Sequence, residues 1–109
     1  IPKEKKDMFG RFIGQKVIVR ADDAGVHFGT LKAASANGSV ELANSRRLWR
    51  WKTLMGISLS DVAFWGIDDS GSKICQVIPF HGVIGVCEII PCTQDAIMTI
   101  ENAPVAEAE

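Results

Sequence analysis

Alternation of apolar and polar residues dominates the first half of the chain and predicts β-strands. The segments QKVIVRA (15–21), VHFGTLKAA (26–34) and VELA (40–43) are rich in β-branched or alternating residues. Between the second and third segments, the pair Asn37-Gly38 is typical of a tight hairpin turn. We therefore expect a meander of three neighbouring antiparallel strands.

Two segments carry the start signals of short helices. In SLSDVAFWG, Ser58 is placed to cap a helix N-terminus, with Asp61 three residues later and Gly66 as a stop signal. In TQDAIMTIENA, Thr93 is the capping residue, and apolar side chains recur at helical spacing. These signals predict helices near Leu59–Trp65 and Gln94–Asn102.

Between these helices, KICQVIPF (73–80) and GVIGVCEII (82–90) are expected to form two further strands. Pro79 indicates an edge position or a strand end for the first, because proline cannot donate a backbone hydrogen bond. The whole pattern predicts an α+β fold that is mainly β. We expect a strongly bent antiparallel sheet or small barrel of about five or six strands with one or two short helices.

The length of 109 residues, with 47% hydrophobic residues, fits a single domain with one core. We assign 1–12 to an N-terminal extension, 13–102 to a single small β-rich domain, and 103–109 to a flexible acidic tail. The 12 basic and 13 acidic side chains give a formal net charge of -1, so any anion-binding surface must be local.

No apolar run reaches the roughly 18 to 20 residues of a membrane span, so we expect a soluble protein without a membrane partner. The three cysteines, at 75, 87 and 92, are odd in number and lack C-x-x-C spacing, which favours a reducing cytoplasm. We expect a structural role for the thiols, as small hydrophobic groups.

The stretch NSRRLWRWKTLMG concentrates three arginines and two tryptophans between positions 46 and 51. In a strand, 47, 49 and 51 would share one face, and 46, 48 and 50 the other. Arginine matches phosphate or carboxylate and tryptophan stacks on planar groups, so the stretch suits a nucleotide or nucleic-acid surface. Alternatively, both tryptophans face the core and the arginines are solvated or pair with aspartates. The main candidate binding residues are Arg46, Arg47, Trp49, Arg50 and Trp51.

A second candidate lies in AGVHFGTL, where glycines on both sides would let a ligand approach the backbone near His27 and Phe28. Histidine is the side chain whose charge changes most readily near neutral pH. We add both residues to the candidate binding surface. A structural or exposed position is the alternative for His27 and for the other histidine, His81.

The chemistry-bearing residues form no recognisable catalytic or metal-binding pattern. The aspartate pairs at 22–23 and 68–69 could bind a hard cation, but a solvated turn is the favoured interpretation. No Ser, Cys, Asp or Glu is spaced from a histidine as a triad or metal cage requires. We therefore expect no enzyme activity, no cofactor and no metal site.

Three unusual motifs in a fixed order carry a resemblance to a known group of proteins. IGQKVIVRADDAGVHFGTL is followed by LANSRRLWRWKTLMGISLSDVAFWGI and then by EIIPCTQDA. Over residues 13–97 the chain resembles a family of short uncharacterised proteins encoded by tailed bacteriophages and prophages. The resemblance implies a phage origin and a host cytoplasm, and it brings no established activity.

These observations favour a small non-enzymatic binding protein in the host cytoplasm. The leading expectation is counter-defence, in which the Arg and Trp surface sequesters a nucleotide-type signal or blocks a host or defence protein. One alternative is a virion accessory or decoration protein; another is a nucleic-acid-binding module, which the balanced charge disfavours. We also expect a homo-oligomer, because three tryptophans and five phenylalanines exceed what one small core covers.

Overall fold

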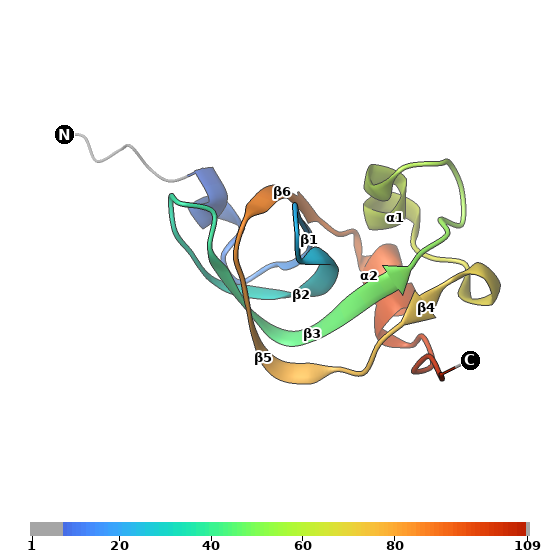
Figure 1. The fold of residues 1–109 in the computed structure, drawn as a ribbon. Coiled ribbons are helices and arrows are strands. Elements are labelled where there is room, and N and C mark those ends of the chain that lie inside the picture. Colours follow the sequence, from blue (N-terminus) through green and yellow to red (C-terminus); the bar gives the residue numbers. More distant parts are fainter. Residues whose placement is uncertain (1–7, 109) are drawn as a thin grey trace.

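The protein combines a curled antiparallel sheet with two short helices, as the computed structural model of residues 8–108 shows (Figure 1). The strands are β1 (Lys16–Ala21), β2 (Gly25–Ala34), β3 (Val40–Arg50), β4 (Lys73–Ile74), β5 (Ile78–Val83) and β6 (Val86–Pro91). The helices are α1 (Leu59–Trp65) and α2 (Gln94–Glu101), with 3-10 turns η1 (Met8–Phe12) and η2 (Asp69–Gly71).

The sheet has the strand order β4-β3-β2-β1-β6, and β5 pairs with the first half of β3. Every pairing is antiparallel, and β1, β2 and β3 form the predicted meander. In the described part of the chain β5 and β6 each have one strand neighbour, so the sheet is strongly curled but not closed. This confirms the α+β fold with a strongly bent antiparallel sheet of six strands.

A bulge in β3 contributes to this curl. The register between β2 and β3 shifts so that β3 has one extra residue opposite Gly29. Asn44 lies in the bulge with a φ of 52°, a left-handed conformation that asparagine tolerates better than most residues. A Cβ on Gly29 would lie 3.1 Å from the carbonyl oxygen of Ala43, so glycine permits the close approach. Such a bulge increases the local twist of the strand pair.

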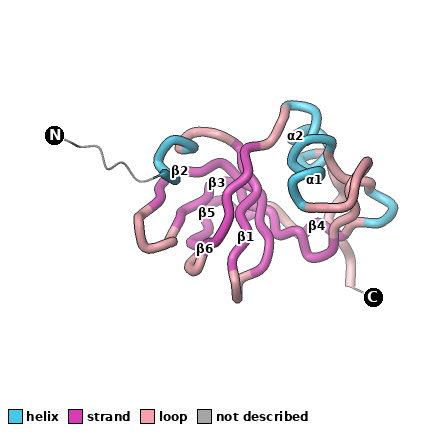
Figure 2. The backbone as a smooth tube through the Cα atoms, turned by 90° about the horizontal axis from the view of Figure 1, so that it is seen from above, coloured by secondary structure: helices cyan, strands magenta, loops and turns pink. Residues whose placement is uncertain are grey.

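Two apolar clusters cover the two faces of the sheet, and β1 contributes to both. The first, which we call the sheet core, fills the inside of the curl with Val17, Val19, Ala21, Leu31, Val40, Leu42, Val83 and Val86. The second, the helix core, packs the opposite face against α1 and α2 through Ile18, Phe28, Leu48, Leu59, Val62, Ala63, Ile67, Ile74, Ile97, Ile100 and Ala103. Figure 2 shows both helices gathered at one end of the curled sheet.

Both helix predictions are confirmed to within one residue. α1 has the expected limits, and α2 ends at Glu101, with Asn102 as its C-cap. Asp61 accepts hydrogen bonds from the backbone N–H groups of Ser58 and Ile57 at 3.1 and 3.0 Å, and these bonds lower the pKa of Asp61. Asp61 therefore acts as its sequence position predicts, and Thr93 caps α2 by accepting from the Ala96 N–H at 3.1 Å.

Two strand predictions need correction, because each apolar segment is divided. The segment 73–80 contains β4 and the start of β5. Both strands pair with β3, and an irregular stretch at 75–77 separates them. The segment 82–90 turns at Gly85, whose φ is 80°, and continues as β6 on the opposite edge of the sheet. A local apolar pattern does not show such a break, because the break depends on which strand each half pairs with. Pro79 lies in the edge strand β5, as expected.

The segments beside the central domain contact it. Phe12 of η1 packs against the sheet core, and Ala103 is buried in the helix core. The Ala106 N–H donates to the Ile74 carbonyl at 2.9 Å, so the chain after α2 lies beside β4. Residues 1–7 and 109 of the expected extension and tail lie outside the described residues. Neither helix of the described chain is long and apolar enough to cross a membrane.

Candidate functional site

β3 places the three arginines of the Arg and Trp stretch in three different environments. Arg46 is the cross-strand neighbour of Phe28 and faces the helix core. Arg47 is the neighbour of His27, and strand alternation puts both on the inner side of the curl. Arg50 is exposed at the end of β3, with its guanidinium carbon 5.9 Å from the centre of the Trp49 ring.

Arg46 has a structural role, and only 2% of its surface is exposed. Its Nη1 donates to the carbonyl oxygens of Ile100 and Ala103, both at 2.8 Å, and its Nε donates to the carbonyl of Cys75 at 2.8 Å. The first two carbonyls lie at the C-terminal end of α2, where unpaired carbonyls and the helix dipole favour a cation. Burial lowers the pKa of Arg46, but a guanidinium stays charged. Arg46 therefore does not belong to an exposed binding surface.

His27 is fully buried and neutral at pH 7. Its Nε2 lies 2.7 Å from the carbonyl oxygen of Ala24; because a carbonyl only accepts, Nε2 carries the proton and Nδ1 is bare. Nδ1 has no hydrogen-bond partner among residues 8–108. Burial is the main cause that lowers the pKa of His27 to about 4; the bond to Ala24 opposes this shift, and Arg47 and His81 add to it.

A polar pocket of about 260 Å³ lies where the chain between β4 and β5 leaves β3. It is lined by Ser45, Arg47, Cys75, Gln76, Ile78 and His81, and we call it the His-Arg pocket. Nδ1 of His81 lies 3.0 Å from Oγ of Ser45, and its ring meets the His27 ring edge-on, with the centroids 4.6 Å apart. Burial and the charge of Arg47 lower the pKa of His81.

Arg47 supplies the fixed positive charge of this pocket. Its Nη1 donates to the Ala24 carbonyl at 2.9 Å, the same oxygen that accepts from His27. This bond holds the guanidinium against the turn between β1 and β2. No carboxylate within residues 8–108 forms an ion pair with Arg47, so its remaining N–H groups can meet an anion.

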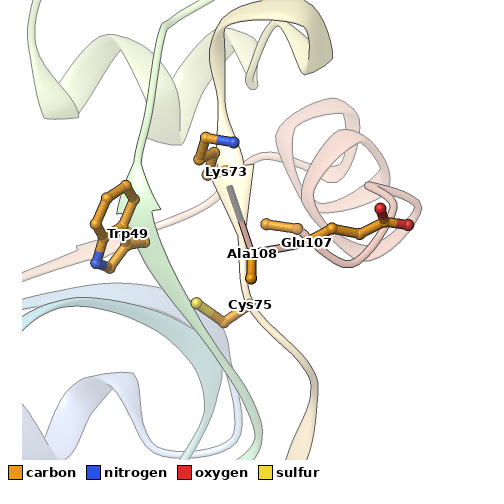
Figure 3. Close-up of a pocket in the computed structure, with 6 residues that line it drawn as sticks. Trp49, Lys73, Cys75, Glu107 and Ala108 are labelled. Carbon is orange, nitrogen blue, oxygen red and sulfur yellow. The ribbon is translucent and has the colours of Figure 1, made fainter.

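A second pocket of about 360 Å³ adjoins the first and shares Cys75 with it. It is lined by Trp49, Lys73, Cys75, Ala106, Glu107 and Ala108, and we call it the Trp49 pocket (Figure 3). Figure 3 shows Trp49 on one side and the chain after α2 on the other, with the Glu107 carboxylate pointing away from Trp49. Trp49 is 63% exposed, so a large part of its ring is available for contact.

The two pockets share Cys75 and each includes side chains of β3, and together we call them the β3 groove. Strand alternation puts Ser45, Arg47 and Trp49 on the same side, and Arg47 and Trp49 are about 7 Å apart along the strand. The His-Arg pocket is smaller than the roughly 300 Å³ at which small-molecule sites typically begin, so a ligand larger than a simple anion that contacts Arg47 would extend into the Trp49 pocket.

The other predicted site residues lie away from this groove. Phe28 is 2% exposed in the helix core, and Trp51 packs against the same core because β3 ends at Arg50. The face shared by positions 47, 49 and 51 in a regular strand therefore ends after Trp49. Of the seven candidates, Arg47 and Trp49 line the groove, Arg50 borders Trp49, and His27 lies behind His81.

Sequence reasoning missed Ser45, His81 and Cys75 as parts of one site. Ser45 and His81 are 36 positions apart and meet only because β5 pairs with β3. No local spacing signals this contact. Cys92 fits the structural role expected for the thiols, since burial raises its pKa to about 12, whereas Cys87 is exposed.

One protein-family model matches most of the chain. The family model described as a domain of unknown function, DUF6948, matches residues 14–100. The chain belongs to the DUF6948 family. The DUF6948 match includes every residue of the His-Arg pocket and Trp49, whereas Ala106, Glu107 and Ala108 lie beyond it. A search of curated proteins finds no significant match.

The β3 groove of this DUF6948 domain combines charged, polar and aromatic side chains. Ser45 is fully buried, and its hydroxyl contacts Nδ1 of His81 at 3.0 Å. Within residues 8–108, no group of three or more His, Cys, Asp or Glu side chains is arranged to hold a metal ion. The groove instead offers a fixed cation, a histidine and an exposed indole.

Proposed function

We propose that this DUF6948 protein is a non-enzymatic binding protein that holds a small nucleotide-like anion in the β3 groove. The observation that carries the proposal is the position of Arg47 and Trp49, on one side of one strand and in two adjoining pockets. In this arrangement the Arg47 guanidinium binds a phosphate and the Trp49 ring stacks on the base.

His81 supplies a second contact to the phosphate. When Ser45 donates to Nδ1 of His81, the proton of the neutral ring is on Nε2, which can donate to a phosphate oxygen. A bound anion also favours the protonated ring and raises the pKa of His81. Binding is therefore expected to strengthen as the pH falls toward the pKa of His81.

We assign this binding to counter-defence in a bacterial host cytoplasm, where the protein sequesters a nucleotide-type signal. Support comes from the sequence resemblance to short phage and prophage proteins, together with the character of the groove. Sequestration requires affinity and abundance, and it requires no catalytic group.

Isothermal titration calorimetry with AMP, adenosine and inorganic phosphate tests the proposal. The parent protein should bind AMP more tightly than adenosine or phosphate, because only AMP occupies both pockets. Arg47→Gln should weaken AMP binding about 10- to 100-fold, the range of a charge-assisted hydrogen bond. Trp49→Ala should bring AMP affinity close to that of phosphate.

Arg11→Gln is the matched control, since Arg11 is exposed in η1, away from the groove. This variant should bind AMP like the parent, and all three variants should have similar melting temperatures. Failure of AMP and phosphate to bind at millimolar concentration, or equal binding by Arg47→Gln and the parent, would contradict the proposal.

A further inference from the structure

An exposed apolar surface lies at the α1 end of the molecule, away from the β3 groove. Its members are large hydrophobic residues of α1, of α2 and of the loop that precedes α1, with exposed fractions between 42% and 90%. We call it the α1 patch: Leu54, Met55, Ile57, Phe64, Trp65 and Met98. In Figure 1 α1 and its preceding loop lie on the outside of the molecule, at the end opposite the turn between β2 and β3.

Hydrogen bonds hold the loop before α1 against the helix. The Leu54 N–H donates to the Gly66 carbonyl at 3.0 Å, so the loop is bound to the C-terminal end of α1. At the other end of the helix, the Ile57 N–H donates to Asp61 at 3.0 Å. The Phe64 and Trp65 rings meet edge-on with their centroids 4.8 Å apart, and Leu54 and Met98 line one shared depression.

The area of the α1 patch is unusual for a monomer. From the exposed fractions and the roughly 200 Å² of a large apolar side chain, the patch presents roughly 700 Å². That area is above the roughly 300 to 600 Å² of the largest apolar patch on a typical monomeric protein. Two such patches facing each other would bury roughly 1,400 Å², within the range of a stable protein interface.

The charge of the patch favours an identical partner. Between Thr53 and Ile67 the chain has one charged residue, Asp61, and its carboxylate accepts from the backbone of Ile57 and Ser58. The six side chains of the patch are themselves uncharged, so contact between two copies of it needs no charge pairing; Asp68 and Asp69 border it at the depression that Leu54 and Met98 line. The formal net charge of -1 gives two copies little mutual repulsion.

We propose that the α1 patch is the interface of a two-fold dimer, in which the loop and α1 of one copy pack on the same elements of a second copy. A two-fold interface is self-complementary, and an uncharged apolar surface meets this condition without charge pairing. The proposal is independent of ligand binding, because the β3 groove uses none of the patch residues.

Sedimentation-velocity analysis from 1 to 200 μM tests the dimer with a matched pair of isoleucine variants. Ile57, in the patch, is 90% exposed, and Ile84, in the turn between β5 and β6, is 77% exposed, so neither substitution removes a core side chain. Ile57→Asp should raise the dimer dissociation constant about thirtyfold or more, since a two-fold interface contains the new charge twice. Ile84→Asp should leave the constant within about twofold of the parent.

Phe64→Glu is a second patch variant and should act in the same direction as Ile57→Asp, with an unchanged far-UV circular dichroism spectrum. A parent protein that stays monomeric at 200 μM overturns the proposal and leaves the patch to a different partner. A dimer that Ile57→Asp and Phe64→Glu leave intact, or that Ile84→Asp disrupts equally, overturns it as well.

Discussion

At the scale of single residues, neighbouring arginines have different roles because a strand alternates its faces. Arg46 is enclosed by the helix core and donates to three backbone carbonyls, whereas Arg47 borders an open pocket. Arg50 is exposed at the strand end, beside Trp49. Substitutions at these positions should therefore change different properties.

Arg46→Met should lower the free energy of unfolding by about 2 to 4 kcal/mol, because it leaves buried carbonyls at the end of α2 without donors. Arg50→Met should change it by less than about 0.5 kcal/mol. Urea unfolding monitored by circular dichroism measures both values. Equal stability of the Arg46→Met variant and the parent would show that the three hydrogen bonds contribute nothing net.

His27 should make the fold less stable in mild acid. Its pKa is about 4 in the folded protein and near 6.5 in an unfolded chain, so between these values the unfolded state binds the extra proton. The contribution of neutral His27 to the free energy of unfolding is complete above about pH 6.5. It falls by roughly 2 to 3 kcal/mol as the pH drops to about 4. His81, whose pKa is also lowered, adds to the same trend.

Urea unfolding of the parent and of His27→Gln between pH 4 and 7 tests this expectation. The variant should be less stable at pH 7, because the Ala24 carbonyl loses a buried donor. Its stability should also depend less steeply on pH. An identical pH slope in the two proteins would exclude His27 as the titrating group.

At the scale of elements, the bulge at Asn44 decides which β3 side chains reach the His-Arg pocket. Leu42 faces the sheet core before the bulge, and Ser45 and Arg47 line the pocket after it. A regular strand would put position 44, and not Ser45, on the side of Leu42. The extra residue therefore brings Ser45 next to His81.

The backbone at Asn44 gives a direct test of the bulge. Asn44→Val should lower the free energy of unfolding by about 1 to 2 kcal/mol, because a β-branched residue is strained at a φ of 52°. Asn44→Gly should be at least as stable as the parent, since glycine adopts positive φ freely. Thermal unfolding compares the two variants. Equal destabilisation by both would locate the effect in the asparagine side chain.

At the scale of the whole molecule, β1 joins the two cores into one cooperative unit. Val17 and Val19 belong to the sheet core, and Ile18 between them belongs to the helix core. Neither core can lose its packing without disturbing the other, because both depend on the same six residues of backbone.

Ile18→Ala and Val19→Ala should therefore each lower the stability of the entire domain by about 2 to 4 kcal/mol. Far-UV circular dichroism follows the strands and helices, and near-UV circular dichroism follows the tryptophans near the helices. The two signals should share one midpoint in each variant. Separate midpoints in the Ile18→Ala variant would mean that the helix core unfolds on its own.

The sequence determined the features that depend on neighbouring residues. Alternation placed β1, β2 and the start of β3, and capping residues placed α1 and α2. The Arg and Trp stretch was also visible as an unusual composition. These signals are local, because backbone geometry and helix capping act over a few residues.

Only the tertiary structure decided what depends on strand pairing. The contact between Ser45 and His81, the burial of Arg46 against α2, and the turn at Gly85 all join segments whose pairing the local pattern does not encode. The bulge at Asn44 then changed which residues face inward, and the end of β3 at Arg50 separated Trp51 from Trp49. The physical reason is that side-chain alternation specifies a face only relative to a register, and the register is set by partners distant in the chain.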